Sequence, residues 1–360
     1  MTFFSLSTSP LTRLKTGRAG DTERPATAKR PGMRGRLGPR GMRKARRRME
    51  NTIASIERSP GIVALDGPFT HNHVSVRGIR LHLAEAGSPT APLVLLIHGA
   101  FGGWYDFRGV IEPLSQQGFH VAALDLRGYG MSDKPPTGYD LRHAAGEINS
   151  VIAALGHDDA LIVGSDIGAS IAWATASLYP ERVRGLVTMG AIHPTDMRRA
   201  ILRNPYLYSA DIARLTFFRL PTLLHKFFQF SIPRAARREI TTNTSASFQR
   251  SKAFKDLVRL RKKALSIDHT MTPIIRSNRY LVGAMPSKNT HEGIDAPVLI
   301  LRTNTRRWEH LSTVARARVN GQLITVATPS NVELPYLEQP AEFAETVAEF
   351  ARSATDTPKS

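Results

Sequence analysis

The chain has 360 residues, which is enough for one large domain with an insertion or for two domains. It contains no cysteine, so disulfides, thiolate nucleophiles and thiolate metal sites are excluded. The formal net charge is +19, and no apolar run approaches the ~18 residues that a membrane-spanning helix requires. We therefore expect a soluble protein of the cytoplasm.

The positive charge is concentrated at the start of the chain. Fourteen of the 49 Lys and Arg residues lie in the first 48 positions, against two acidic residues. This stretch is rich in Gly and Pro and shows no hydrophobic period, which predicts a disordered basic tail over residues 1–50. Three interpretations stay open: a transit peptide, a basic arm for an anionic membrane or nucleic acid, and a start codon placed too early, with Met42 or Met49 as the true beginning.

Short β-rich runs begin near Phe69. A strand pair is predicted at 73–78 and 79–87, followed by continuous apolar strands at 93–99, 120–126, 160–166 and 184–190. Amphipathic helical stretches, such as 141–155 and 167–178, separate these strands. Apolar strands alternating with helices indicate a mostly parallel, doubly wound α/β sheet that is covered on both faces.

Between about 194 and 292 the strands stop, and the sequence becomes helical, Arg-rich and aromatic. Strands return at 297–303 and 322–328, before a final helix at 340–351. The middle segment is therefore a helical cap inserted into one sheet after its sixth strand. We expect a first core segment at 51–195, the cap at 196–290 and a second core segment at 291–360.

The stretch "VGSDIGA" at 163–169 lies where a strand turns into a helix. A sharp strand-to-helix turn needs glycines two positions before and after the exposed side chain, because the neighbouring backbones pack closely there. Gly164 and Gly168 frame Asp166, whereas Ser165 lacks such a pair. The pattern makes Asp166 the candidate nucleophile; its alternative role is an ordinary helix cap.

An aspartate in this position favours one kind of chemistry. A carboxylate is ionised at neutral pH and displaces a leaving group from an sp3 carbon, such as an epoxide or alkyl halide carbon, giving a covalent ester. Hydrolysis of the ester needs a base, a water and donors for the oxyanion. The backbone N–H groups of Ile167 and of Ala100, in the turn after His98 and Gly99, are the candidate donors.

Five motifs occur in the order of a known family: "LLIHG", "ALDLRGYGMSDKP", "VGSDIGA", "YPERVRGLV" and "LEQPAEF". The chain resembles, from about 69 to 350, the epoxide hydrolase branch of the α/β-hydrolase superfamily, with haloalkane dehalogenases as close relatives. The resemblance implies the α/β-hydrolase fold with a substrate cavity between cap and core. It also implies an aspartate nucleophile, a histidine base oriented by an acid, and two cap tyrosines that donate to the epoxide oxygen.

The sequence departs from this pattern at the base and at its orienting acid. In the family a Gly-His pair stands shortly before "LEQP", where this chain has Val332 and Glu333. Glu333 is therefore the candidate substitute base. The acid expected after the strand at 297–303 is replaced by Thr and Asn, which leaves Asp196 as a compensating candidate. Packing or surface roles are expected for the histidines of the insertion and its surroundings, namely His193, His225, His269, His291 and His310.

Of the two cap tyrosines that the resemblance implies, only the second has a counterpart in this sequence. Tyr280 falls where the second family tyrosine stands, with a packed aromatic as its alternative role. Arg214 lies near the position of the first tyrosine, and Tyr206 and Tyr208 lie one to two helical turns away. Phe101 replaces the usual proline of the oxyanion turn.

Three functional hypotheses follow. The first is an epoxide hydrolase-like enzyme that acts on a hydrophobic substrate through Asp166, with turnover impaired because Glu333 replaces the histidine base. The second is a single-turnover relative, in which Asp166 is alkylated but the ester is not released. The third is a catalytically inactive relative that binds a small molecule or lipid. None of these hypotheses requires a cofactor or a metal, and the sequence gives no indication of oligomeric state.

Overall fold

Eight strands form the centre of the protein, as seen in a computed structural model that describes residues 58–220, 231–285, 293–328 and 332–355. The predicted basic tail lies outside the described residues. The strands are β1 (Thr70–Val76), β2 (Ile79–Ala86), β3 (Leu93–Ile97), β4 (His120–Leu124), β5 (Ala160–Ser165), β6 (Val183–Met189), β7 (Val298–Arg302) and β8 (Leu323–Ala327).

The strands form a single sheet in the order β1-β2-β4-β3-β5-β6-β7-β8. The hairpin of β1 and β2 is antiparallel and joins β4 antiparallel, while the other neighbours pair in parallel. Parallel strands align their carboxyl ends along one edge of a sheet, and in this class of fold ligands bind at that edge. The predicted mostly parallel, doubly wound sheet is confirmed.

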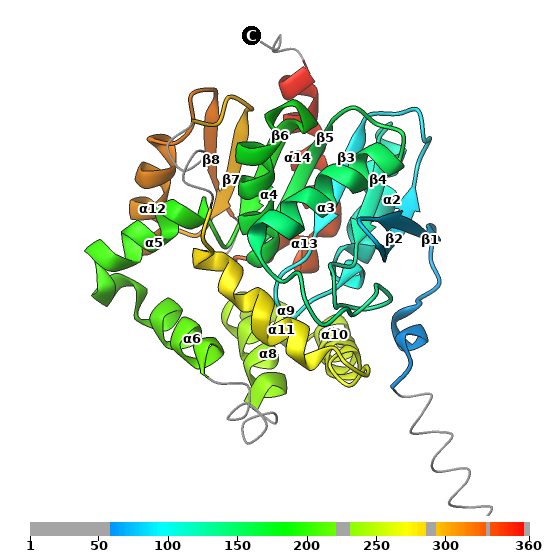
Figure 1. The fold of residues 1–360 in the computed structure, drawn as a ribbon, viewed down its shortest axis with the longest axis horizontal. Helices are drawn as coiled ribbons and strands as arrows, with labels where there is room; N and C mark the ends of the chain where they lie inside the picture. The colour runs from blue at the N-terminus through cyan, green and yellow to red at the C-terminus, as the bar shows by residue number, and fades with distance from the viewer. Residues whose placement is uncertain (1–57, 221–230, 286–292, 329–331, 356–360) are drawn as a thin grey trace, which may run out of the picture. The chain divides into compact units, whose positions relative to one another are not determined.

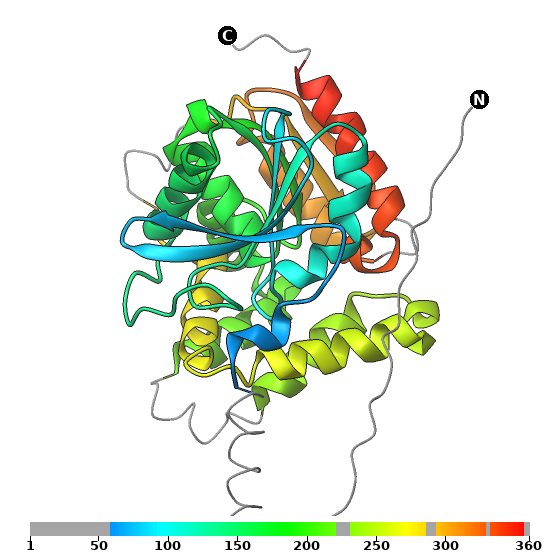
Figure 2. The same cartoon turned by 90° about the vertical axis from the view of Figure 1, so that its right-hand side faces the viewer.

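Helices cover both faces of the sheet. The alternation of side chains along a strand explains this, because Leu93, Leu95 and Ile97 of β3 enter one apolar core, while Val94 and Leu96 enter a second core. The first core receives α3 (Leu141–Ala154), α4 (Ile167–Leu178) and α12 (Arg306–Arg316), and the second receives α2 (Arg108–Gln116), α13 (Pro335–Glu338) and α14 (Pro340–Thr355). Figure 2 shows α2 and α14 on one side of the sheet and α3 and α4 on the other.

The chain between β6 and β7 forms the predicted helical cap. Its elements are α5 (Pro194–Arg203), η4 (Pro205–Tyr208), α6 (Ser209–Arg219), α8 (Ser231–Thr242), α9 (Ala246–Arg250), α10 (Lys252–Ala264), α11 (Met271–Ser277) and η5 (Asn278–Val282). In Figure 1 the helices α6, α8, α10 and α11 gather below one end of the sheet. The remaining short 3-10 turns are η1 (Pro60–Val63), η2 (Trp104–Phe107) and η3 (Pro180–Arg182).

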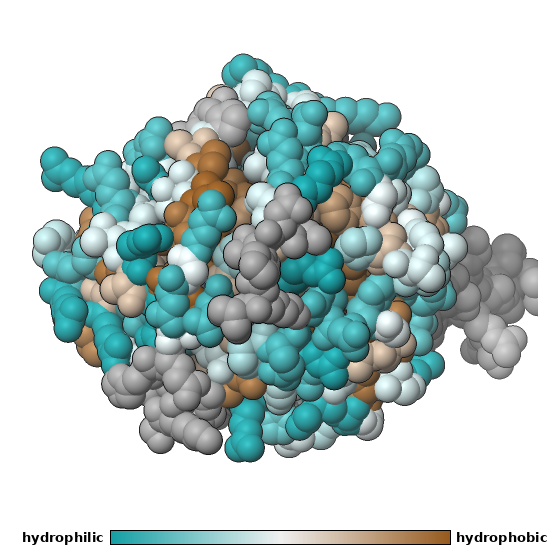
Figure 3. Space-filling view, turned by 90° about the horizontal axis from the view of Figure 1, so that it is seen from above, coloured by the Kyte–Doolittle hydropathy of each residue, from teal (hydrophilic) through white to brown (hydrophobic). Residues whose placement is uncertain are grey.

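The face of the molecule away from the cap is mostly hydrophilic, with small apolar areas between the polar side chains (Figure 3). Among the described helices, none combines the length and the hydropathy that crossing a bilayer demands.

Candidate functional site

Asp166 occupies a sharp turn between β5 and α4. Its backbone angles, φ 54° and ψ −115°, lie in a region that L residues rarely adopt. Such a conformation costs of the order of 1–3 kcal/mol and persists where the surrounding structure imposes it, most often at functional sites. The turn lifts the Asp166 side chain above the carboxyl end of β5, towards the cap.

The two glycines of the motif are required by close backbone approach. A Cβ atom on Gly164 would lie 2.5 Å from the carbonyl oxygen of Gly168, and a Cβ on Gly168 would lie 2.3 Å from that of Ile97. Both distances are far inside van der Waals contact, and backbone atoms move only with their strands. The glycines therefore bring β5, α4 and β3 together beneath Asp166.

Replacing Gly168 with alanine is therefore expected to lower the free energy of unfolding by about 1–3 kcal/mol, because the new methyl group overpacks against the Ile97 carbonyl. Urea denaturation followed by circular dichroism measures the change. Gly61→Ala is the matched control, since a Cβ there meets only the Ser59 hydroxyl oxygen, at 3.6 Å. Equal stabilities of the two variants would contradict the packing argument.

The predicted oxyanion donors both act on the carboxylate of Asp166, the candidate nucleophile. The backbone N–H of Ala100 donates to Asp166 Oδ2 at 3.1 Å, and the N–H of Ile167 helps to lower the pKa of the carboxyl group. His98 supports this turn from below: its Nδ1 lies 2.7 Å from the Gly99 carbonyl oxygen, and its Nε2 accepts from the Leu126 N–H. Burial lowers the pKa of His98, so a neutral ring with the proton on Nδ1 fits both contacts.

Arg214, on α6 of the cap, forms an ion pair with Asp166. Its Nη1 donates to Oδ1 and its Nη2 to Oδ2, each at 2.8 Å, in a bidentate ion pair. The Nε of Arg214 donates to Asn278 Oδ1, which fixes the plane of the guanidinium. The residue near the position of a family tyrosine is thus a cation bound to Asp166, a contact that sequence reasoning missed.

The ion pair sets the charge of Asp166. Burial alone would raise the pKa of this carboxyl, but the Arg214 guanidinium and the Ala100 and Ile167 N–H groups hold it below its ordinary value. Asp166 is therefore ionised at neutral pH, with 13% of its side chain exposed. An ionised carboxylate is the reactive form, although two strong hydrogen bonds also stabilise it before any reaction.

Glu333 is engaged by partners of its own on α12. Its Oε1 accepts from Trp308 Nε1 at 2.6 Å and lies 3.7 Å from Arg307 Nη1, both on α12. Arg307 in turn binds Asp211 of α6. Among the described residues no hydrogen bond or ion pair joins Glu333, the predicted substitute base, to Asp166.

Tyr280 is packed in η5 with 5% of its surface exposed. Burial raises the pKa of its hydroxyl. Tyr206 is 80% exposed, and the Tyr208 hydroxyl hydrogen-bonds His310 Nδ1. The tyrosine that the structure brings to the oxyanion turn is Tyr129, whose hydroxyl donates to the Ala100 carbonyl.

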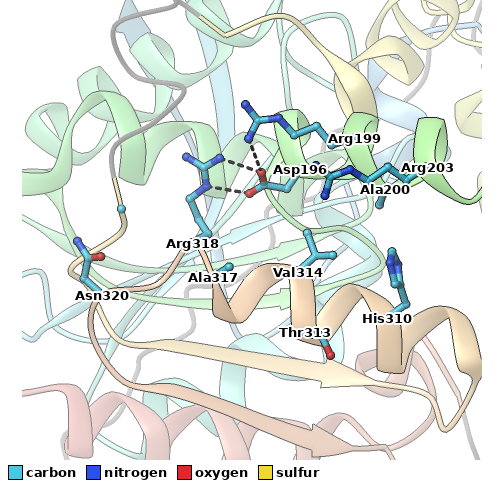
Figure 4. A pocket seen from close by; sticks show the side chains of 11 residues that line it. Asp196, Arg199, Ala200, Arg203, His310, Thr313, Val314, Ala317, Arg318 and Asn320 are labelled. Carbon is cyan, nitrogen blue, oxygen red and sulfur yellow. Dashed lines mark hydrogen bonds and ion pairs between the residues drawn. The ribbon is translucent and has the colours of Figure 1, made fainter.

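Asp196 lines a cleft of about 670 Å³ between α5 and α12. Figure 4 shows its carboxylate bound by Arg318, at 2.8 and 2.9 Å, and approached by Arg199 at 3.5 Å. These contacts leave no role for Asp196 as the orienter of a base at Asp166.

The described histidines of this region take structural positions. His193 caps α5 by accepting from the Thr195 N–H, and burial lowers its pKa to about 4. His310 bonds the side chains of Asn204 and Tyr208, and His269 is exposed on a loop. His225 and His291 lie outside the described residues. The sequence after His310 contains no further histidine.

A buried ionic cluster joins the cap to the core and was not predicted. Arg261 of α10 donates to both carboxylate oxygens of Asp106, in η2, and its Nη1 lies 2.5 Å from Glu239 Oε2, on α8. The side chain of Arg261 is 3% exposed. A sequence signal was available, because Phe254, Leu257 and Ala264 mark the apolar stripe of α10 and Arg261 falls on it.

A mostly parallel sheet, a strained acidic elbow and a cap inserted after the sixth strand define a capped α/β-hydrolase. A family model described as the alpha/beta hydrolase fold matches residues 92–304, and the chain belongs to this family. The predicted fold class is thereby confirmed.

The comparisons also confirm the resemblance to epoxide hydrolases. Epoxide hydrolase 4 of Mus musculus is 32% identical over 49% of this chain and 50% of its own length, and the AB hydrolase superfamily protein YfhM of Bacillus subtilis is 35% identical over 46% and 55%. The chain spans about half the length of these curated relatives. A putative α/β hydrolase from Nostoc sp. PCC 7120 shares the fold with a TM-score of 0.69, at 21% identity over 78% of this chain and 97% of its own.

Proposed function

We propose that the protein is an epoxide hydrolase-like enzyme in which Asp166 attacks the carbon of a small hydrophobic epoxide or alkyl halide. The observation that carries the proposal is the strained elbow, which holds an ionised carboxylate against the Ala100 and Ile167 N–H groups. The carbon–oxygen or carbon–halogen bond breaks as the Asp166 ester forms. The same N–H groups then receive the oxyanion when water attacks the ester.

Arg214 takes the part that the cap tyrosines play in the family. Its two Nη groups already lie 2.8 Å from the carboxylate oxygens, at the place where an electrophile must approach. A guanidinium there donates to the departing alkoxide or halide. The same ion pair stabilises the free enzyme, and stabilisation of the ground state without equal stabilisation of the transition state slows the reaction. We therefore propose slow alkylation.

Hydrolysis of the Asp166 ester is the second step that we propose to be slow. The position that holds the histidine base in the family holds Glu333, whose carboxylate is engaged by Trp308 and lies near Arg307. The ester is therefore hydrolysed slowly. The closed Asp166–Arg214 pair also favours the alternative function, an inactive relative that binds a small molecule, and one experiment separates the two.

The full chain is incubated with styrene oxide and, separately, with 1-bromohexane, and its intact mass is recorded. The proposal predicts a gain of one substrate equivalent in the wild type and no gain in Asp166→Asn, because the amide is not a nucleophile and tolerates the same backbone conformation. Asp158→Asn, which removes an exposed carboxylate from the loop before β5, controls for surface alkylation. An unmodified wild type with both probes would favour the binding module.

A further inference from the structure

The cleft between α5 and α12 contains more positive than negative charge. One carboxylate lines it, that of Asp196, together with the arginines Arg199, Arg203 and Arg318. Three guanidinium groups against one carboxylate leave a surplus of two positive charges among the described lining residues, with His310 counted as neutral. The cleft volume of about 670 Å³ falls in the range of ~300–1,000 Å³ that small-molecule sites occupy. The cleft is therefore large enough for a small anion.

The buried arginine of the cleft, Arg318, engages both oxygens of the carboxylate. Its Nε donates to Asp196 Oδ2 at 2.8 Å and its Nη2 donates to Oδ1 at 2.9 Å, and 6% of the Arg318 side chain is exposed. Arg199 Nη1 lies 3.5 Å from Asp196 Oδ1, which is longer than a charged hydrogen bond, and 45% of the Arg199 side chain is exposed. The bidentate pair is therefore complete without Arg199, which lines the cleft beside it (Figure 4).

Arg203 lines the cleft next to Arg199. In the described part of the chain, neither a hydrogen bond nor an ion pair joins the Arg203 side chain to another residue. The two arginines are four residues apart on α5, so they lie on one face of the helix with their Cβ atoms about 5–6 Å apart. Two like charges at this spacing destabilise a helix, and an anion between them removes the repulsion. Both guanidinium groups therefore have hydrogen bonds to donate to a ligand.

Two other polar side chains of the cleft are engaged by the protein itself. Both ring nitrogens of His310 have partners, the Asn204 side-chain nitrogen at 3.1 Å and the Tyr208 hydroxyl at 2.6 Å. The hydroxyl of Thr313 donates to the Glu309 carbonyl oxygen one turn earlier in α12. The strongest donors that remain for a ligand are therefore the guanidinium groups on α5, and they favour a negatively charged ligand.

Small apolar residues form another part of the cleft wall. Ala200 lines the cleft from α5, while Val314 of α12 and Ala317 at the C-cap of that helix line it from the other helix. Side chains of this size leave room for an organic group, and their methyl groups provide the apolar contacts that ligand pockets commonly make. An anion that carries an organic group therefore fits the cleft better than a bare ion.

We propose that this cleft is a binding site for a small, soluble phosphate monoester. The phosphate group lies between Arg199 and Arg203, and the organic group lies against the apolar part of the wall. A phosphate monoester carries about two negative charges at pH 7.5, which matches the surplus charge of the cleft. Its three terminal oxygens accept hydrogen bonds from two guanidinium groups at once. The inference goes beyond the proposed function, because it requires no chemistry from Asp166.

Calorimetric titration of the full chain with phenyl phosphate at pH 7.5 tests the site. We expect saturable binding by the wild type and an affinity at least ~10-fold lower in Arg203→Gln, because this variant loses a charged hydrogen bond to the phosphate. Arg198→Gln is the matched control: it removes an exposed arginine of α5 that does not line the cleft, and it should bind like the wild type. Thermal unfolding checks that each variant keeps its fold. No binding by the wild type, or equal affinities of the wild type and Arg203→Gln, would overturn the site.

Two further probes define the class and the source of the ligand. Benzoate has the same ring but a single negative charge, so it should bind at least ~10-fold more weakly than phenyl phosphate, and equal affinities would overturn the assignment to a phosphate. Vesicles that contain phosphatidic acid present the phosphate group on a lipid surface. The wild type and Arg203→Gln should bind these vesicles equally, whereas a loss of vesicle binding in Arg203→Gln would replace the soluble ligand with a lipid headgroup.

Discussion

Replacing Arg214 with leucine should lower the free energy of unfolding by about 3–5 kcal/mol at pH 7, because it leaves the buried Asp166 carboxylate without its cation. Urea denaturation at equilibrium measures the loss. The double variant Asp166→Asn with Arg214→Leu is the control, since removal of both charges should recover most of the lost stability. A loss below 1 kcal/mol in the single variant would show that the pair is solvent-screened.

The effect of Arg214→Leu should depend on pH. In the wild type the folded pKa of Asp166 is lowered, so its contribution to stability is present above the unfolded pKa of about 3.9 and is lost as the pH falls through the folded pKa. In the variant, burial without a cation raises the folded pKa, and acid favours the folded state relative to neutral pH. The difference in stability between the two proteins should therefore narrow from pH 7 towards pH 4.

Replacing Arg261 with leucine should also cost about 3–5 kcal/mol, because two buried carboxylates, Asp106 and Glu239, lose their shared partner. Arg259→Leu on the same helix is the matched control. Arg259 pairs with Asp256 at the surface, with 68% of its side chain exposed, and such pairs contribute about 0–1 kcal/mol. Denaturation of the two variants side by side measures the contrast. Equal losses would mean that the Arg261 cluster does not hold the cap to the core.

Most of the fold can be predicted because short stretches of the sequence specify its elements. The eight strands follow from apolar runs, and the elbow follows from two glycines that frame Asp166, since close backbone approach admits no other residue there. The insertion of the cap follows from the loss of strands after β6. The strands and the elbow are each encoded within a dozen neighbouring residues, and the cap is encoded by a long stretch that contains no strand pattern.

The side-chain partners were not predictable in the same way. Arg214 lies 48 residues beyond Asp166, and the two meet only because α6 packs over the carboxyl end of β5. Glu333 stands at the position of the family histidine, yet the donors of α12 hold its carboxylate. Asp196 pairs with Arg318, 122 residues away. Long-range pairs depend on how the cap packs, which residue spacing does not encode.

The central claim is that Asp166 is the nucleophile. Its most direct test is fragmentation mass spectrometry of the peptide that carries both Ser165 and Asp166, after incubation of the full chain with styrene oxide. We expect the adduct on the Asp166 carboxyl group and an unmodified Ser165. An adduct on Ser165, or on Glu333 with Asp166 unmodified, would contradict it.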